Sequence, residues 1–217
     1  RAAPGGGVYA SDNRYPIAAP KVEVWWQRAR AFQLTADRRG YYLLDEEAYF
    51  MWAGTAPDIG SVGTRPAVEL VLGPDGDGVL IMDQYGALTM TSEAELSNAA
   101  TFNPAPPRFG DPRVRSFAVT SDYRGIYTLD GLGRIYPSGT AATLNPATPT
   151  FDQDIAIKIK LRRDGKGYYV LDRYGRVHAG GSALALKANY AAHMGEDWAR
   201  DFELTEDETG YYLLDKF

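Results

Sequence analysis

The hydrophobic and polar positions of this chain follow a short alternating pattern that recurs along its length. In stretches such as "FEL" (202–204) and "IKL" (159–161), apolar and polar residues alternate with the period of a strand that buries one face. An Asp- and Gly-rich turn follows, then a Tyr- and Leu-rich run, a second Gly turn and a third short strand. A sustained helical period is missing, and the best candidate for a helical turn is 91–102. We therefore predict an all-β chain.

Five copies of one unit account for this pattern. Each has an apolar residue, followed by an Asp three positions later, a Gly six positions later and a second Asp eleven positions later. The two most similar copies, residues 29–45 and 199–215, share 12 of 17 positions without a gap. The five sets are Leu34/Asp37/Gly40/Asp45, Leu72/Asp75/Gly78/Asp83, Val119/Asp122/Gly125/Asp130, Leu161/Asp164/Gly167/Asp172 and Leu204/Asp207/Gly210/Asp215.

The spacing of the units predicts the architecture. Their glycines, at positions 40, 78, 125, 167 and 210, lie 38, 47, 42 and 43 residues apart. Units of about 40–45 residues with three or four strands are typical of β-propeller blades. The fifth unit ends at Phe217 after its second strand, and "GGGVYA" (5–10) resembles the missing part, with Gly6 in place of Gly175 and Val8 in place of Val177. Joining Phe217 to Gly6 gives a period of 42, which falls within the other values.

We therefore predict a single five-bladed β-propeller domain with blades of about 42 residues, the last one closed by an N-terminal strand added to the C-terminal strands. The blade cores are expected near 29–54, 67–91, 114–139, 156–181 and 199–217, the last completed by 6–16. Closure places Leu213 and Val8 on neighbouring strands of one sheet. The alternative is an open fragment of a longer repeat array. The chain begins with Arg1 and not with Met, which indicates a processed chain or a piece of a longer one.

Two segments carry a resemblance to known proteins. The stretches "GYYVLDRYGRVHAGG" (167–181) and "DWARDFELTEDETGYYLLD" (197–215) resemble the repeat of a loosely defined group of exported bacterial propeller proteins. The resemblance extends over all five units and is best in the fourth and fifth. It implies a propeller in the periplasm or at the cell surface, often as a module of a larger surface protein, and it implies no catalytic activity. The ring size also resembles that of five-bladed lectins and glycosidases, which is a likeness of architecture alone.

Composition and charge exclude several classes of function. The chain has 217 residues, a net charge of −5 and no cysteine, which excludes disulfides, thiolate metal sites and cysteine nucleophiles. In its longest basic stretch, "KIKLRRDGK" (158–166), lysines alternate with apolar residues, which is typical of a strand edge followed by a turn. We therefore predict no nucleic-acid partner. Apolar runs are too short for a membrane-spanning helix.

The recurring Asp residues are the most obvious candidates for chemistry. The stretch "DGDG" (75–78) resembles the start of a calcium loop, but a later acidic ligand is missing and the other units replace its second acid. We interpret the first Asp of each unit as a hairpin-turn residue and the second as the end of a strand before a turn. The two histidines, His178 and His193, lie near no nucleophile motif. The sequence therefore predicts no metal, cofactor or catalytic residue.

Polar residues on the innermost strands form a second candidate set. We expect them to line a solvated axial channel, and they are Gln33, Glu69, Lys158, Lys160, Asp201 and Glu203. A glycosidase would instead need two acids converging on one mouth of that channel. Further acids for such a pair lie just before inner strands, at Asp111, Asp154 and Asp197.

The four tryptophans are the remaining candidates for binding. Trp25, Trp26, Trp52 and Trp198 fall at strand ends or in connections, where they pack between blades or form a surface for a sugar or a protein partner. The favoured function is a non-enzymatic module for protein–protein or structural assembly at the bacterial cell surface or in the periplasm. A lectin-like, carbohydrate-binding propeller is the first alternative, and a five-bladed glycoside hydrolase is the second.

Overall fold

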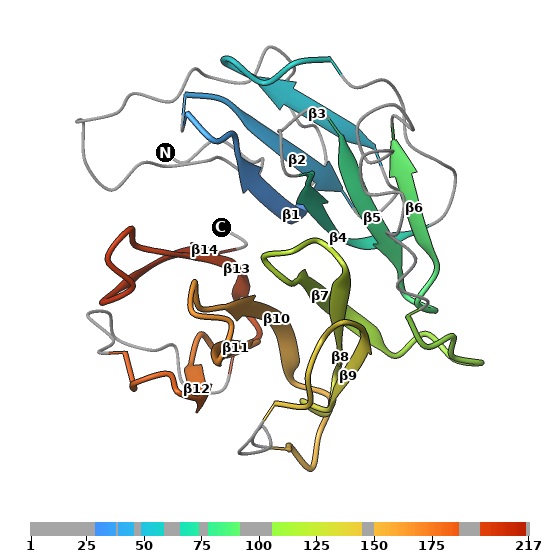
Figure 1. Ribbon diagram of the computed structural model, residues 1–217, viewed down its shortest axis with the longest axis vertical. Helices are drawn as coiled ribbons and strands as arrows, with labels where there is room; N and C mark the ends of the chain where they lie inside the picture. The colour runs from blue at the N-terminus through green and yellow to red at the C-terminus, as the bar shows by residue number, and fades with distance from the viewer. Residues whose placement is uncertain are drawn as a thin grey trace.

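The computed structural model describes residues 29–37, 39–45, 49–58, 66–73, 78–91, 106–144, 150–186 and 196–215. Its regular elements in these ranges are all β-strands, arranged in five small antiparallel sheets (Figure 1). The strands are β1 (Ala29–Leu34), β2 (Tyr41–Asp45), β3 (Phe50–Ala53), β4 (Ala67–Leu72), β5 (Val79–Asp83), β6 (Leu88–Thr91), β7 (Val114–Val119), β8 (Gly125–Asp130), β9 (Ile135–Gly139), β10 (Ala156–Leu161), β11 (Gly167–Asp172), β12 (Val177–Gly181), β13 (Ala199–Leu204) and β14 (Tyr211–Asp215). The prediction of an all-β fold is confirmed.

Each sheet corresponds to one sequence repeat. The first four sheets have three consecutive strands each, and the fifth has β13 and β14 within the described residues. The register also repeats: Ala29 opposes Asp45, and Ala199 opposes Asp215. In every sheet the first strand carries an irregularity between its first and third residues, so one extra residue lies opposite the partner strand there. Identical spacing in the sequence thus produces identical pairing.

The first Asp of the repeat holds the hairpin turn, as the sequence predicted. In the third sheet, the hydroxyl of Thr120 donates to Asp122 and accepts from the backbone N–H of Gly125 at 2.9 Å. The backbone N–H of Arg124 donates to the same Asp at 3.0 Å. Tyr123 in this turn has a φ of 54°, a left-handed conformation that costs a non-glycine residue energy. The turns at 35–40 and 205–210 have the same Thr, Asp and Gly bonds.

The second Asp of the repeat ends a strand and holds the following turn, again as predicted. Oδ1 of Asp172 accepts from the backbone N–H groups of Tyr174 at 2.9 Å and Arg176 at 3.0 Å. Asp83 and Asp130 accept the corresponding pairs of bonds. The predictions for Asp75, for the side chains of Asp45 and Asp215, and for a helical turn beyond Thr91 lie outside the described residues.

Successive sheets pack face to face through hydrophobic clusters that join the first sheet to the second, the second to the third, and onward to the fifth. The first strands also follow one another in space: β1 contacts β4, β4 contacts β7, β7 contacts β10 and β10 contacts β13. Finally, β13 contacts β1, so the order of contacts is cyclic. Figure 1 shows these first strands gathered toward the middle of the molecule.

The fifth sheet is less covered than the others. Tyr212 on β14 is 50% exposed, whereas its counterparts in the repeat, Tyr42, Tyr127 and Tyr169, are at most 2% exposed. These three buried tyrosines lie on the middle strands of three-stranded sheets, and each donates its hydroxyl to a backbone carbonyl. The same sequence position therefore has a different environment in the fifth sheet, where the described residues provide two strands.

Candidate functional site

The third residue of each first strand lies at the centre of the molecule. These five equivalent positions are all at most 2% exposed, and they hold Ala31, Glu69, Ser116, Lys158 and Asp201. Each follows the irregularity of its strand and opposes the second strand of its own sheet. We call the four polar members Glu69, Ser116, Lys158 and Asp201 the central cluster. Four different sheets contribute them, so the cluster exists only in the assembled fold.

Ion pairs hold the central cluster together. The Nζ atom of Lys158 lies 2.7 Å from Oε2 of Glu69 and 3.1 Å from Oδ2 of Asp201. Both are close ionic contacts. All three charged side chains are 1–3% exposed. One ammonium group thus faces two carboxyl groups in a site without bulk water.

Glu69 has two further hydrogen-bond donors around it. The hydroxyl of Ser116 donates to its Oε2 at 2.8 Å, and the backbone N–H of Leu70 donates to its Oε1 at 3.2 Å. The Ser116 hydroxyl in turn accepts from the backbone N–H of Ile159 at 3.2 Å. Burial raises the pKa of Glu69 above its ordinary value; the charge of Lys158 opposes this rise and that of Asp201 adds to it. Glu69 therefore holds a proton more readily than an ordinary glutamate.

Asp201 accepts backbone hydrogen bonds on both oxygens. The N–H of Phe202 donates to Oδ1 at 2.7 Å, and the N–H of Phe32 donates to Oδ2 at 3.1 Å. Phe32 belongs to β1 and Asp201 to β13, so this contact joins the first sheet to the fifth. Buried carboxyl groups need such donors, because an unpaired charge in a dry interior is costly.

A second pair of charges lies two residues further along the first strands. Nζ of Lys160 is 2.6 Å from Oε1 of Glu203, and both side chains are half-buried. Burial lowers the pKa of Lys160, but the carboxyl groups of Glu203, Asp201 and Glu69 outweigh it and raise the pKa above its usual range. Gln33, at the corresponding position of β1, is also half-buried.

The six predicted channel residues therefore separate into two layers. The expectation of a solvated lining is wrong for Glu69, Lys158 and Asp201, which are buried. The physical reason is that opposite charges and backbone N–H groups satisfy these side chains, so they do not need water. Lys160, Glu203 and Gln33 keep partial contact with solvent.

The other acids considered for a glycosidase pair lie in ion pairs with nearby arginines. Asp111 pairs with Arg113 at 2.5 Å, and Asp154 pairs closely with Arg115. Asp197 is 2.7 Å from Nη1 of Arg200. These carboxyl groups are each about half exposed, and their partners come from the ends of the first strands or the turns before them.

The two described tryptophans have opposite environments. Trp198 is buried, its indole N–H donates to the carbonyl of Tyr174 at 3.0 Å, and its ring lies against Gly175. Trp52 is 37% exposed on β3 and stacks on Phe50 with 6.2 Å between ring centroids. Trp198 is thus a packing residue, whereas Trp52 lies on a surface. The candidates Trp25 and Trp26 lie outside the described residues.

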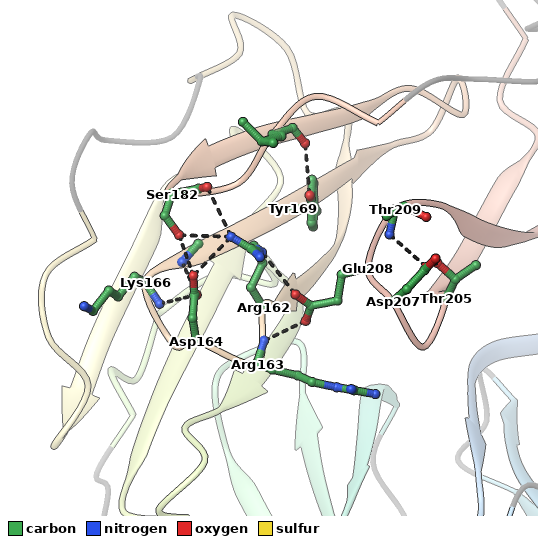
Figure 2. A network of polar contacts seen from close by, with 12 residues as sticks. Arg162, Arg163, Asp164, Lys166, Tyr169, Ser182, Thr205, Asp207, Glu208 and Thr209 are labelled. Atoms are coloured by element: carbon green, nitrogen blue, oxygen red, sulfur yellow. Dashed lines mark hydrogen bonds and ion pairs between the residues drawn. The ribbon is translucent and has the colours of Figure 1, made fainter.

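Figure 2 shows a polar network between the fourth and fifth sheets that the sequence analysis missed. Arg162 occupies the position that threonine holds in three other repeats, and its Nε donates to Oε2 of Glu208 at 3.1 Å. The backbone N–H of Arg163 donates to Oε1 of Glu208 at 2.7 Å, and Nη1 of Arg162 donates to Asp164 and to Ser182. The replacement of threonine by arginine at this repeat position could have indicated the network in the sequence, because a longer cationic side chain can reach the neighbouring turn.

His178 is a strand residue that pairs with the second Asp of its own repeat. Its Nε2 lies 2.9 Å from Oδ2 of Asp172, and the hydroxyl of Tyr136 donates to the equivalent oxygen of Asp130 at 3.0 Å. The part of the chain that the structure describes holds no group of three or more His, Asp or Glu residues suited to a metal ion. His193 lies outside it.

Comparisons with known proteins do not place the chain in a family. The search of protein-family models found no match, and neither did the search of curated proteins. Within the described residues, no helix is long and apolar enough to cross a membrane. The proposed function therefore rests on the sequence repeat and on the contacts of the described residues.

Proposed function

We propose that this chain is a five-bladed β-propeller that acts as a non-catalytic module for protein–protein contact or structural assembly. The cyclic order of contacts among β1, β4, β7, β10 and β13 supports the propeller, because stacking small sheets around an axis buries a face of each against its neighbour. The sequence period supports it independently. On the resemblance of the repeat, we place the module in the periplasm or at the bacterial cell surface.

The exposed face of the fifth sheet supports closure by the N-terminal segment 6–10. A third strand beside β14 would give this sheet the same three strands as the other four sheets. It would also cover Tyr212, whose counterparts are buried. Because the chain has no cysteine, a Val8→Cys and Leu213→Cys pair provides its only thiols. A short bis-maleimide should join the two thiols within one folded chain. Reaction only between chains, or none, would contradict closure.

The non-catalytic assignment rests on one observation: the charged side chains of the central cluster are paired with one another. Glu69 and Asp201 both face Lys158 in a buried site, whereas a glycosidase needs an acid pair that is open to substrate. The recurring Asp residues hold turns by bonds to the backbone. These acids are thus explained by the fold.

The exposed rings at β3 are the surface that we assign to a protein partner. Tyr49 is 66% exposed, and the rings of Trp52, Phe50 and Tyr42 stack in series from the surface to the core. Aromatic side chains anchored in this way are typical of interface hot spots. Among the described residues β3 is an edge strand, and it has neither a charged residue nor a proline, the features that usually keep sheet edges from pairing.

The test is affinity capture from an extract of the source cells, followed by in-cell cross-linking and reciprocal capture of each recovered protein. A partner bound by the wild type should be lost with Tyr49→Ala/Trp52→Ala and kept with Tyr85→Ala, which removes an exposed aromatic ring from the second sheet. Equal recovery by both variants would contradict this assignment. Stacked aromatic rings also suit sugars. A glycan array with Trp52-dependent binding would therefore favour the lectin alternative.

Turnover of a chromogenic glycoside that is abolished by both Glu69→Gln and Asp201→Asn would favour the hydrolase alternative and overturn the non-catalytic assignment. The two variants preserve the size of each side chain, so loss of activity with retained folding would identify the acids as the reacting groups.

A further inference from the structure

The central cluster brings together the three groups needed to form an amide bond between side chains. It has an amine at Lys158, a carboxyl group 3.1 Å away at Asp201, and a second carboxyl group 2.7 Å from the same amine at Glu69. We propose that Lys158 and Asp201 are joined by an amide bond that the folded protein forms by itself, with Glu69 relaying protons. This inference is independent of the proposed function.

The reaction balances without any other reactant. Nζ of Lys158 attacks Cγ of Asp201, a C–N bond forms, and one C–O bond of the carboxyl group breaks. The ammonium nitrogen gives up two protons, and both leave with the departing oxygen as one water molecule. Glu69 accepts a proton from the nitrogen and delivers it to the oxygen, so it is unchanged at the end. No oxidant, reductant or cofactor takes part.

We assign Asp201 as the acyl partner because both of its donors are backbone N–H groups, whereas one of the two donors to Glu69 is the hydroxyl of Ser116. Both oxygens of Asp201 accept backbone N–H bonds, from Phe202 at 2.7 Å and from Phe32 at 3.1 Å. Fixed N–H groups of this kind stabilise the negative charge that develops on oxygen when a nucleophile attacks a carboxyl carbon. One of them, Phe32, belongs to the first sheet, so the acyl site is complete only when β1 lies against β13.

Glu69 is suited to the relay by its position and its protonation. Its Oε2 contacts Nζ of Lys158 and also accepts from the Ser116 hydroxyl, so the carboxyl group is held on the amine. Burial raises its pKa above the ordinary value, so the Glu69 carboxylate is a stronger base toward the neighbouring ammonium than an exposed glutamate.

The surroundings favour the product. The reaction consumes a buried ammonium and a buried carboxylate, and a dry interior penalises such charges more than a neutral amide. Nζ already lies in contact with the Asp201 carboxyl group, so attack needs no large movement of either side chain. Groups held in contact by the fold react as if at very high concentration, with effective molarities of about 10⁵–10⁸ M in the best-aligned cases. Amide formation here would link β10 covalently to β13.

The wild-type protein provides the direct test by mass spectrometry under denaturing conditions. The intact mass should be lower than the sequence mass by one water molecule, and a digest should contain one branched peptide that joins Lys158 to Asp201. Asp–Gly steps such as Asp164–Gly165 also lose water as succinimides, so the protein is first incubated at mildly alkaline pH, which hydrolyses succinimides to aspartate or isoaspartate and leaves amides intact. A full sequence mass after this treatment, or a branch joining Lys158 to Glu69, would overturn the assignment.

Two variants separate the chemistry from folding. Glu69→Gln keeps the shape of the side chain and an oxygen for the bond from Ser116, so the fold should persist while the branched peptide is lost. Lys160→Arg is the matched control, because it changes the neighbouring lysine of β10 and should leave the branched peptide at its wild-type yield. A folded Glu69→Gln variant with undiminished branching would refute the relay. Loss of branching in Lys160→Arg would refute the assignment to Lys158.

Discussion

Replacing Trp198 with alanine tests whether this residue is a packing group or part of a binding surface. Its ring is buried against the fourth sheet, its indole N–H donates to the carbonyl of Tyr174, and its apolar neighbours include Leu171 and Phe202. Loss of a buried tryptophan costs about 3–5 kcal/mol of the free energy of unfolding, because a cavity remains. For a domain of this size, that cost corresponds to a fall in melting temperature of roughly 6–20 °C.

The assay is thermal unfolding followed by circular dichroism, with Trp52→Ala as the matched control. Trp52 is 37% exposed and stacks on Phe50, so its loss should cost less than that of Trp198: about 0.5–1.5 kcal/mol for the ring pair, in addition to the apolar area that it covers. Trp198→Phe should lie between the two, because it keeps a ring in the cavity but leaves the Tyr174 carbonyl without its donor. Equal melting temperatures for Trp198→Ala and Trp52→Ala would refute the distinction between a packing and a surface tryptophan.

Three further predictions concern the turns, the sheet contacts and closure. Hydrogen bonds lower the folded-state pKa of Asp207 from 3.8 to about 2. The stabilising contribution of its charge is therefore complete above pH 3.8 and disappears as the pH falls through 2. The difference in urea midpoint between wild type and Asp207→Asn should shrink over that pH window. Gly175→Ala should lower the free energy of unfolding in urea by about 1–3 kcal/mol, because its Cβ would lie 2.2 Å from the Trp198 ring at a φ of +84°. Gly110→Ala is the control and should leave the free energy of unfolding unchanged, because nothing lies within 4 Å of its Cβ. Similar losses for the two variants would contradict the close packing of Trp198 on Gly175. Deleting residues 1–10 should lower the melting temperature, because the closing strand that we propose lies in this segment, which is outside the described residues; an unchanged value would count against closure.

Most of the local structure follows from the repeat. The Asp and Gly positions predict two turns in each unit, and the alternating and Tyr-rich runs predict the strands between them. These features are local, because a turn depends on bonds between residues a few positions apart, such as Asp122 with Arg124. The same positions recur five times, so the pattern of the chain is sufficient to predict five sheets with one register.

The surroundings of individual repeat positions could not be predicted in this way. Trp52 and Trp198 both lie near strand ends in the sequence, yet one is exposed and the other buried, because burial depends on which sheet covers the residue. Tyr212 and Tyr169 occupy the same repeat position with opposite exposure for the same reason. Arg162 could be recognised as a departure from the repeat, but its partner Glu208 comes from a different unit.

The sequence by itself therefore determined the strands, the turns and the period, since these depend on short-range alternation and turn chemistry. Only the tertiary structure decided that Glu69, Lys158 and Asp201 meet in a buried cluster and do not line a solvated channel. These residues are separated by 89 and 43 positions along the chain and belong to three sheets. Their contact depends on how the sheets pack around a common centre, and long-range packing of this kind leaves no mark on the local pattern of any one repeat.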